Sequence, residues 1–133
     1  MTELFRELNY KDQDPILALG APASFDAELA AMKKDAEIHT APRRGVGYGF
    51  AIAFGENRAQ IEKAGAAVTK VLEGDAVCWF AYPKQTSKKY SSDVNRDDMW
   101  EILGRFGVRP VRQIAIDDDW SALRFRREQY VKS

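Results

Sequence analysis

The side chains that could bind a ligand in this sequence are cations and hydrogen-bonding groups that follow its apolar segments. Gly20 and Ser24 come just after one such segment, Asn57 comes after another, and four cations lie in neighbouring loops. Helix N-termini and arginine guanidinium groups both suit phosphate or carboxylate. The sequence therefore predicts a crevice for a small anionic ligand, with candidate residues Gly20, Ser24, Arg43, Arg44, Asn57, Lys84 and Arg96. In the alternative interpretation, Ser24 and Asn57 only cap helices and the cations are solvated.

A glycine-rich segment, Gly45-Val46-Gly47-Tyr48-Gly49, has the composition of a phosphate-binding loop. Such a loop follows a strand and opens a helix, whereas this segment precedes an apolar strand, so we interpret it as a flexible turn. The loop in the right place, Gly20–Ser24, has one glycine where a nucleotide needs several. Thr40–Arg44 offers arginines and no acid that could accept hydrogen bonds from ribose hydroxyl groups. We therefore expect no cofactor.

Groups that carry catalysis or bind metals in other proteins are sparse in this chain. His39 is the one histidine, and we interpret it as a hydrogen-bonded strand residue. Cys78, the one cysteine, lies in an apolar strand, where a thiol is a small inert hydrophobe. Asp117–Asp119 has the charge for Mg²⁺, but acids at a hairpin turn point in different directions and favour turn geometry. The sequence thus predicts neither catalytic residues nor a metal site.

The polar loop Lys84–Ser92 contains three lysines and a tyrosine, and Arg96 follows it. Basic residues interleaved with an aromatic ring can bind single-stranded nucleic acid, and a mobile loop above a binding crevice is an equal alternative. The chain has 20 basic and 20 acidic residues, so its net charge of zero predicts no general attraction to nucleic acid or to anionic membranes.

The elements that would position these residues follow from the spacing of apolar side chains. Continuous or alternating apolar runs predict strands at Ile16–Leu19, Glu37–Thr40, Phe50–Phe54, Ala76–Tyr82, Val111–Asp117 and Ser121–Arg127. Apolar residues at helical spacing predict a short helix around Leu4–Leu8, a helix over Phe25–Lys33 capped by Ser24, a helix capped by Asn57 with an apolar stripe as far as Leu72, and a helix capped by Asn95 or Asp93 and ended by Gly107.

Strands that are apolar throughout and alternate with helices predict a mostly parallel sheet with right-handed crossovers. The last two strands alternate apolar with polar residues, which predicts an antiparallel hairpin. The 133 residues, 45% of them apolar, suit one domain, 1–133, in which 1–14 form an N-terminal helix and connector. We found no signal-peptide or membrane-spanning pattern, so we expect a cytoplasmic protein.

Three blocks resemble a family of small bacterial proteins of unknown function. They are Val77–Lys84, Asn95–Asp97 and Asp117–Arg126, with the patterns W-x-x-x-P-K and D-x-x-W-S-x-L-R-F. The family looks like a shortened Rossmann-type methyltransferase domain. The resemblance implies an α/β, Rossmann-like layered domain with helices on both faces of a six-stranded sheet, in the order 2-1-3-4-6-5 with the last strand antiparallel. It also implies that one helix–strand unit is missing after Thr40, and that ligands bind between strands 1 and 3.

These observations lead to three hypotheses for the function. The first is non-catalytic binding of a small anionic ligand or a protein partner. The second, from the resemblance, is a reduced S-adenosylmethionine-dependent methyltransferase-like enzyme. The third is weak binding of single-stranded nucleic acid through Lys84–Arg96. No oligomeric state follows from these patterns.

Overall fold

Short apolar runs form the parallel strands at the centre of the sheet. The computed structural model describes residues 1–131. Its strands are β1 (Ile16–Leu19), β2 (Ile38–His39), β3 (Tyr48–Phe54), β4 (Leu72–Pro83), β5 (Val108–Ala115) and β6 (Trp120–Arg127). They form one sheet in the order β2-β1-β3-β4-β6-β5, with β6 antiparallel to both of its neighbours and the other pairings parallel. The predicted strand order and antiparallel last strand are confirmed.

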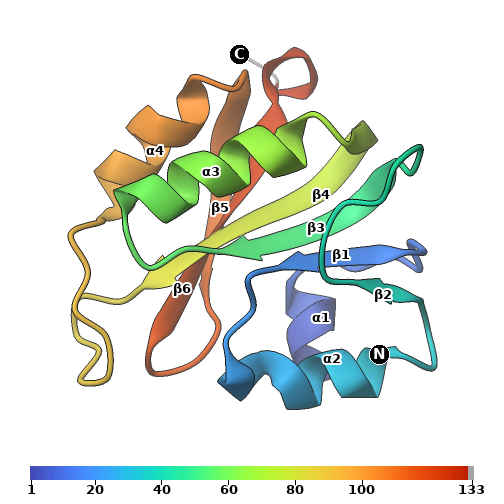
Figure 1. Ribbon diagram of the computed structural model, residues 1–133, viewed down its shortest axis with the longest axis horizontal. Coiled ribbons are helices and arrows are strands. Elements are labelled where there is room, and N and C mark those ends of the chain that lie inside the picture. The colour runs from blue at the N-terminus through green and yellow to red at the C-terminus, as the bar shows by residue number, and fades with distance from the viewer. Residues whose placement is uncertain (132–133) are drawn as a thin grey trace.

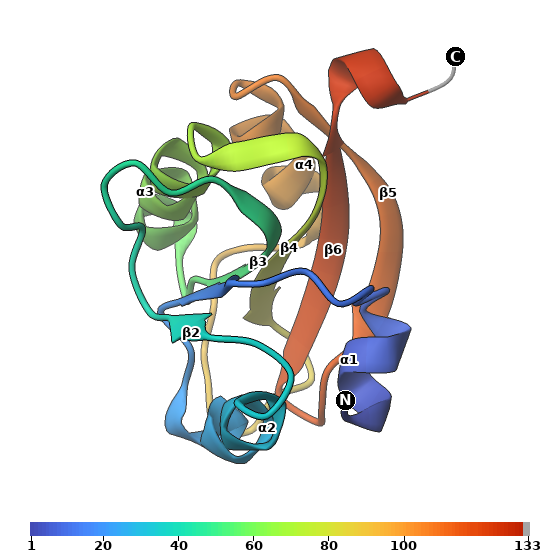
Figure 2. The ribbon, with the colours of Figure 1, turned by 90° about the vertical axis from the view of Figure 1, so that its right-hand side faces the viewer.

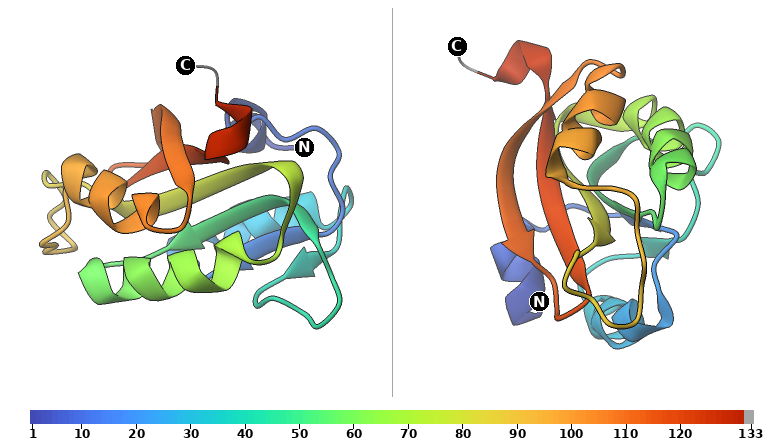
Figure 3. Two further views of the ribbon diagram at one scale, coloured as in Figure 1. Left: turned by 90° about the horizontal axis from the view of Figure 1, so that it is seen from above. Right: turned by 90° about the vertical axis from the view of Figure 1, so that its left-hand side faces the viewer.

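Helices cover both faces of the sheet (Figure 1). Successive residues of a strand point to opposite faces, so each face presents apolar side chains on which helices can pack. The helices are α1 (Glu3–Glu7), α2 (Asp26–Met32), α3 (Arg58–Thr69) and α4 (Arg96–Gly104), with short 3-10 turns η1 (Ala23–Phe25) and η2 (Glu128–Tyr130). One apolar cluster joins α3 and α4 to the sheet, and a second joins α1, η1 and α2 to its other face. Figure 3 shows α3 and α4 side by side on their face.

Two helix caps predicted from the sequence form as expected. The Asn57 side chain accepts a hydrogen bond from the Gln60 backbone at the start of α3. Asn95 caps α4 in a reciprocal box with Asp98. The prediction for Ser24 is wrong, because this residue lies within η1 and α2 begins without a side-chain cap. The 3-10 turn occupies Ala23–Phe25, so α2 begins at Asp26.

The boundary between α3 and β4 differs from the prediction. The helix ends at Thr69, and β4 begins at Leu72, where Leu72 pairs with Tyr48 of β3. The apolar stripe therefore passes from one element into the next, and Leu72 packs into the same cluster from a strand. Gly74, with φ of +57°, lies within β4 and allows the strand to bend at that point.

The connection from β2 to β3 contains no helix, in agreement with the expected loss of a helix–strand unit. Residues 40–47 form this connection, and Gly45 (φ of +76°) makes its turn. Figure 1 shows the segment running across β1 to reach the amino end of β3. Because β2 and β3 are parallel, the segment has to return from the carboxyl edge of the sheet to the amino edge. Across residues 1–131, no helix has the length and apolar character needed to cross a membrane.

Candidate functional site

An apolar groove lies where the carboxyl ends of β1 and β3 meet α3. The strand order reverses between β1 and β3, and ligands of open α/β sheets bind beside such a reversal. The groove has a volume of about 290 Å³, and it is lined by Leu19, Gly20, Phe54, Gln60, Lys63, Ala64 and Ala67. Its walls are mainly apolar, and Gln60 and Lys63 supply its polar side chains. We call this cavity the switch-point groove.

Gly20 is the one member of the predicted crevice that lines the switch-point groove. Its φ is +69°, and a Cβ atom there would come within 3.1 Å of the Phe54 carbonyl oxygen. Both observations require glycine, because other residues are strained at positive φ and the two backbones approach closely. Glycine at position 20 therefore allows the chain to turn after β1, and it allows the backbone there to lie close to the backbone of Phe54.

Aromatic side chains fill the space at the same sheet edge on the other face. The ring centroids of Phe25 and Phe54 are 5.0 Å apart, those of Phe54 and Trp120 are 5.2 Å apart, and those of Tyr90 and Trp120 are 5.0 Å apart. Phe25, Phe54 and Trp120 are buried. The switch-point groove therefore lies on the α3 side of the sheet, and this aromatic row occupies the other side. The sequence pattern did not reveal this row, because its members come from four separate segments.

The other predicted residues at the carboxyl edge lie in separate hollows. Asn57 lines a hollow of about 410 Å³ with Gln60, which also lines the switch-point groove. Lys84 lines a hollow of about 440 Å³ within the 84–92 loop. Arg96 begins α4 and faces Tyr82, where burial raises the tyrosine pKa and the arginine charge opposes that rise. The edge is therefore divided into neighbouring sites instead of one crevice.

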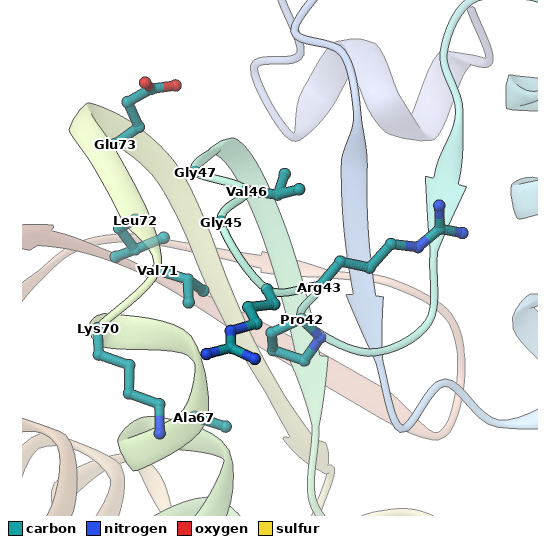
Figure 4. A pocket seen from close by; sticks show the side chains of 11 residues that line it. Pro42, Arg43, Gly45, Val46, Gly47, Ala67, Lys70, Val71, Leu72 and Glu73 are labelled. Carbon is teal, nitrogen blue, oxygen red and sulfur yellow. The ribbon is translucent and has the colours of Figure 1, made fainter.

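Arg43 and Arg44 do not lie at the carboxyl edge, so this part of the predicted crevice is wrong. Arg43 forms an ion pair with Glu37, at 3.2 Å, just before β2. Both arginines line a hollow of about 690 Å³ with Lys70 at the end of α3. Figure 4 shows the Arg43 side chain directed away from Lys70. The returning 40–47 connection carries the two arginines to the opposite edge of the sheet.

His39 takes part in a buried hydrogen-bond network, as the sequence predicts. Its Nδ1 lies 2.6 Å from the Tyr48 hydroxyl, which also accepts a hydrogen bond from the Arg43 backbone. The tautomer of the His39 ring decides which of the two groups donates in this hydrogen bond. Nε2 lies 3.4 Å from a Glu37 carboxylate oxygen. The network joins β2 to β3, and its side chains lie away from the switch-point groove.

The remaining candidate groups have structural roles. The Asp117 carboxylate accepts hydrogen bonds from the backbone N–H groups of Asp119 and Trp120, so the turn interpretation is confirmed. Burial raises the pKa of the Cys78 thiol to about 12. Over residues 1–131, no group of three or more His, Cys, Asp and Glu side chains is placed to hold a metal ion.

Comparison with known proteins gives a result at the level of structure only. No family model and no curated protein matches the sequence. A similar solved structure is the N-methyltransferase NodS from Bradyrhizobium japonicum WM9, with a TM-score of 0.61 and 13% identity over 94% of this chain and 92% of that chain. The fold is that of the S-adenosylmethionine-dependent methyltransferases.

Two further structures agree with this methyltransferase fold. NodS in complex with S-adenosyl-l-homocysteine has a TM-score of 0.59 and 12% identity, over 94% of this chain and 84% of that chain. A SAM-dependent methyltransferase from Aquifex aeolicus has a TM-score of 0.58 and 10% identity, over 93% and 89%. At these identities the similarity establishes the fold.

NodS is solved in complex with S-adenosyl-l-homocysteine, and the switch-point groove of this chain can be compared with the chemistry of that ligand. A mainly apolar cavity of about 290 Å³ can take a flat ring such as adenine. The loop after β1 has one glycine and contains Pro22, which has no backbone N–H to donate. The 40–47 segment after β2 contains no acidic residue, and it runs back to the amino edge of the sheet. The apolar lining suits a flat ring, and the polar side chains that line the groove are those of Gln60 and Lys63.

Proposed function

We propose that this chain is a reduced methyltransferase-type domain that binds the adenine nucleoside part of S-adenosylmethionine or S-adenosylhomocysteine in the switch-point groove. The observation that carries the proposal is the position of the groove, at the strand reversal of a methyltransferase fold. The groove also has the apolar lining that an aromatic ring requires.

The residues of the groove have distinct roles in this proposal. Leu19 contributes an apolar side chain to the floor of the groove, and Ala64 and Ala67 of α3 leave the space that the ring occupies. Small side chains on the inner face of α3 are necessary, because any larger residue would fill the cavity. Lys63 places a cation at the groove, and that charge favours a ligand with a carboxylate.

The cofactor supplies a methyl group when it is bound in methyltransferases, but the proposal for this chain concerns binding alone. The residues that we describe around the groove provide apolar contacts, one amide and one ammonium group. Methyl transfer is a second candidate, favoured by the fold of the structural neighbours.

The test measures thermal unfolding with and without S-adenosylhomocysteine and adenosine. Ligand at ten times its Kd should raise the Tm by about 4 °C. Ala67→Leu, which fills the groove, should abolish the shift. The matched control is Ala66→Leu, because Ala66 is exposed on the same helix and should leave the shift unchanged.

Two results would overturn the proposal. One is the absence of a shift with either ligand at millimolar concentration. The other is an equal shift in the wild type and the Ala67→Leu variant. In separate samples that contain S-adenosylmethionine and a nucleophilic methyl acceptor, formation of S-adenosylhomocysteine together with the methylated acceptor would add methyl transfer to the binding function.

A further inference from the structure

A second candidate site lies on the sheet face opposite α3, where β5 and β6 leave the shelter of α1. Figure 2 shows α1 and the segment that follows it crossing one half of this face. Beyond them, the carboxyl half of β6 and the amino half of β5 have no helix over them in that view. Four arginines lie in or next to this part of the two strands: Arg109, Arg112, Arg124 and Arg126.

The register of the hairpin places these arginines directly opposite one another. Arg112 pairs with Arg124, and Arg109 pairs with Arg126. Residues opposite each other in an antiparallel pair point to the same face, with Cβ atoms about 5 Å apart. Like charges in such positions repel and lower the stability of the sheet. Two successive pairs of arginines are therefore unfavourable unless anions lie between them.

Carboxylates neutralise both members of the outer pair, Arg109 and Arg126. Arg126 donates to Asp75, with Nε 3.0 Å from a carboxylate oxygen, and Arg109 lies 2.6 Å from Glu128. For the inner pair, the structure of residues 1–131 shows no carboxylate within ion-pair distance of Arg112 or Arg124. The positive charges of the inner pair, Arg112 and Arg124, are therefore not balanced by ion pairs with carboxylates of the described residues.

Arg124 is partly buried, and its Nε has no hydrogen-bond partner. It lies between Trp79 of β4 and Arg112 of β5 in the same row of the sheet. Burial lowers the pKa of Arg124, the charges of Arg126 and Arg112 lower it further, and the Asp75 carboxylate opposes this change.

We propose that Arg112 and Arg124 bind a phosphate group, flanked by Arg126 and Arg109. A phosphate carries a charge of about −1.5 to −2 and three acceptor oxygens, which match two adjacent guanidinium forks. The surface is open, so the phosphate group can belong to a free polyphosphate or to the backbone of a nucleic-acid strand. This site is separate from the switch-point groove and does not depend on the proposed function.

The test uses isothermal titration calorimetry with tripolyphosphate at low salt and fluorescence anisotropy with a labelled oligothymidylate. Arg112→Gln and Arg124→Gln should each weaken tripolyphosphate binding about tenfold. Arg124→Lys keeps the positive charge, so its affinity for tripolyphosphate should lie between that of the two glutamine variants and that of the wild type. The control is Arg105→Gln, an exposed arginine of the segment after α4 that loses the same charge and should leave binding within about twofold of the wild type.

Stability separates a binding role from a purely structural one. In phosphate-free buffer, Arg112→Gln should have a higher Tm than the wild type, because it relieves the repulsion, while the stabilisation by tripolyphosphate should shrink. Equal binding by Arg112→Gln, Arg124→Gln and Arg105→Gln would overturn the proposal, as would a wild type that binds neither probe.

The two probes identify the source of the phosphate. Tighter binding of the oligonucleotide than of tripolyphosphate, with a salt dependence that Arg112→Gln reduces by about 0.7 in the log–log slope, would support a nucleic-acid strand. Binding of tripolyphosphate alone would support a free phosphorylated ligand. A response to adenosine that persists in Arg112→Gln would show that the switch-point groove is intact.

Discussion

At the scale of single residues, buried polar groups of this protein find partners far away in the sequence. The Arg127 guanidinium donates to the carbonyl oxygens of Thr69 and Leu72, at 3.1 and 2.9 Å. Carbonyls at the end of a helix lack partners within the helix, so this arginine of β6 completes the end of α3. The Arg127 side chain therefore belongs to the structural framework that joins β6 to the end of α3 and the start of β4.

The Cys78 thiol should be unreactive in the folded protein. Burial raises its pKa to about 12, so about one thiol in ten thousand is ionised at pH 8. A thiol reagent such as Ellman's reagent should label the native protein very slowly at pH 8, and should label it fully and rapidly in 8 M urea. The thiolate fraction grows as the pH rises toward the pKa, so native labelling should accelerate between pH 8 and pH 10. Rapid labelling of the native state at pH 8 would contradict this prediction.

At the scale of elements, the contact between α3 and α4 depends on a glycine. A Cβ atom at Gly65 would lie 2.8 Å from side-chain atoms of Leu103 and Phe106. The glycine lets α4 approach α3 closely, and this approach carries α4 over β4 and closes the core on that face. Helix propensity alone would favour alanine at this position by about 1 kcal/mol.

Replacing Gly65 should therefore reveal which effect is larger. We expect Gly65→Ala to lower the free energy of unfolding by about 1–3 kcal/mol, because the overlap with two packed side chains outweighs the gain in propensity. Gly104→Ala in α4 is the matched control, since its Cβ would contact no atom within 4 Å. That variant should gain about 0.5 kcal/mol. Urea denaturation measures both, and a stabilised Gly65→Ala variant would show that α4 moves away at little cost.

At the scale of the whole molecule, the sheet separates two apolar clusters and the N-terminal segment closes one of them. The Trp79 indole N–H donates to the Leu8 carbonyl oxygen at 2.8 Å, across 71 positions of sequence. Phe5, Leu8 and Tyr10 pack beneath it in the cluster that includes α2. The first turn of the chain thus covers a central strand, and its loss should affect the entire fold.

Trp79→Phe should test this coupling. The variant removes a buried hydrogen bond, leaves the Leu8 carbonyl without its partner and opens space in the core, so we expect a loss of about 2–4 kcal/mol in the free energy of unfolding. Trp100→Phe is the control, because Trp100 is 55% exposed on α4 and its replacement should change stability by less than about 0.5 kcal/mol. Urea unfolding followed by far-UV circular dichroism gives both values. An equal effect of the two substitutions would mean that the N-terminal segment is not coupled to the core.

Most elements of the fold could be predicted because local sequence specifies them. The caps at Asn57 and Asn95 and the turn at Asp117 depend on hydrogen bonds within three residues. Apolar periodicity identified the strands, and the family resemblance supplied their order. Element ends were less predictable: β5 runs from Val108 to Ala115, because the buried Val108 pairs with Arg127, a contact outside any local window.

The candidate sites depended on long-range structure. The zero net charge and the four candidate cations were visible in the sequence, but the path of the 40–47 segment decided which edge Arg43 and Arg44 occupy. The irregularity between Pro110 and Arg112 sets the face on which Arg112 lies, and a shift of one residue would have turned it to the other side. Sequence patterns specify which residues form strands and helices, because those preferences are local. Strand register and loop paths decide which charges meet, because they result from pairing between distant segments.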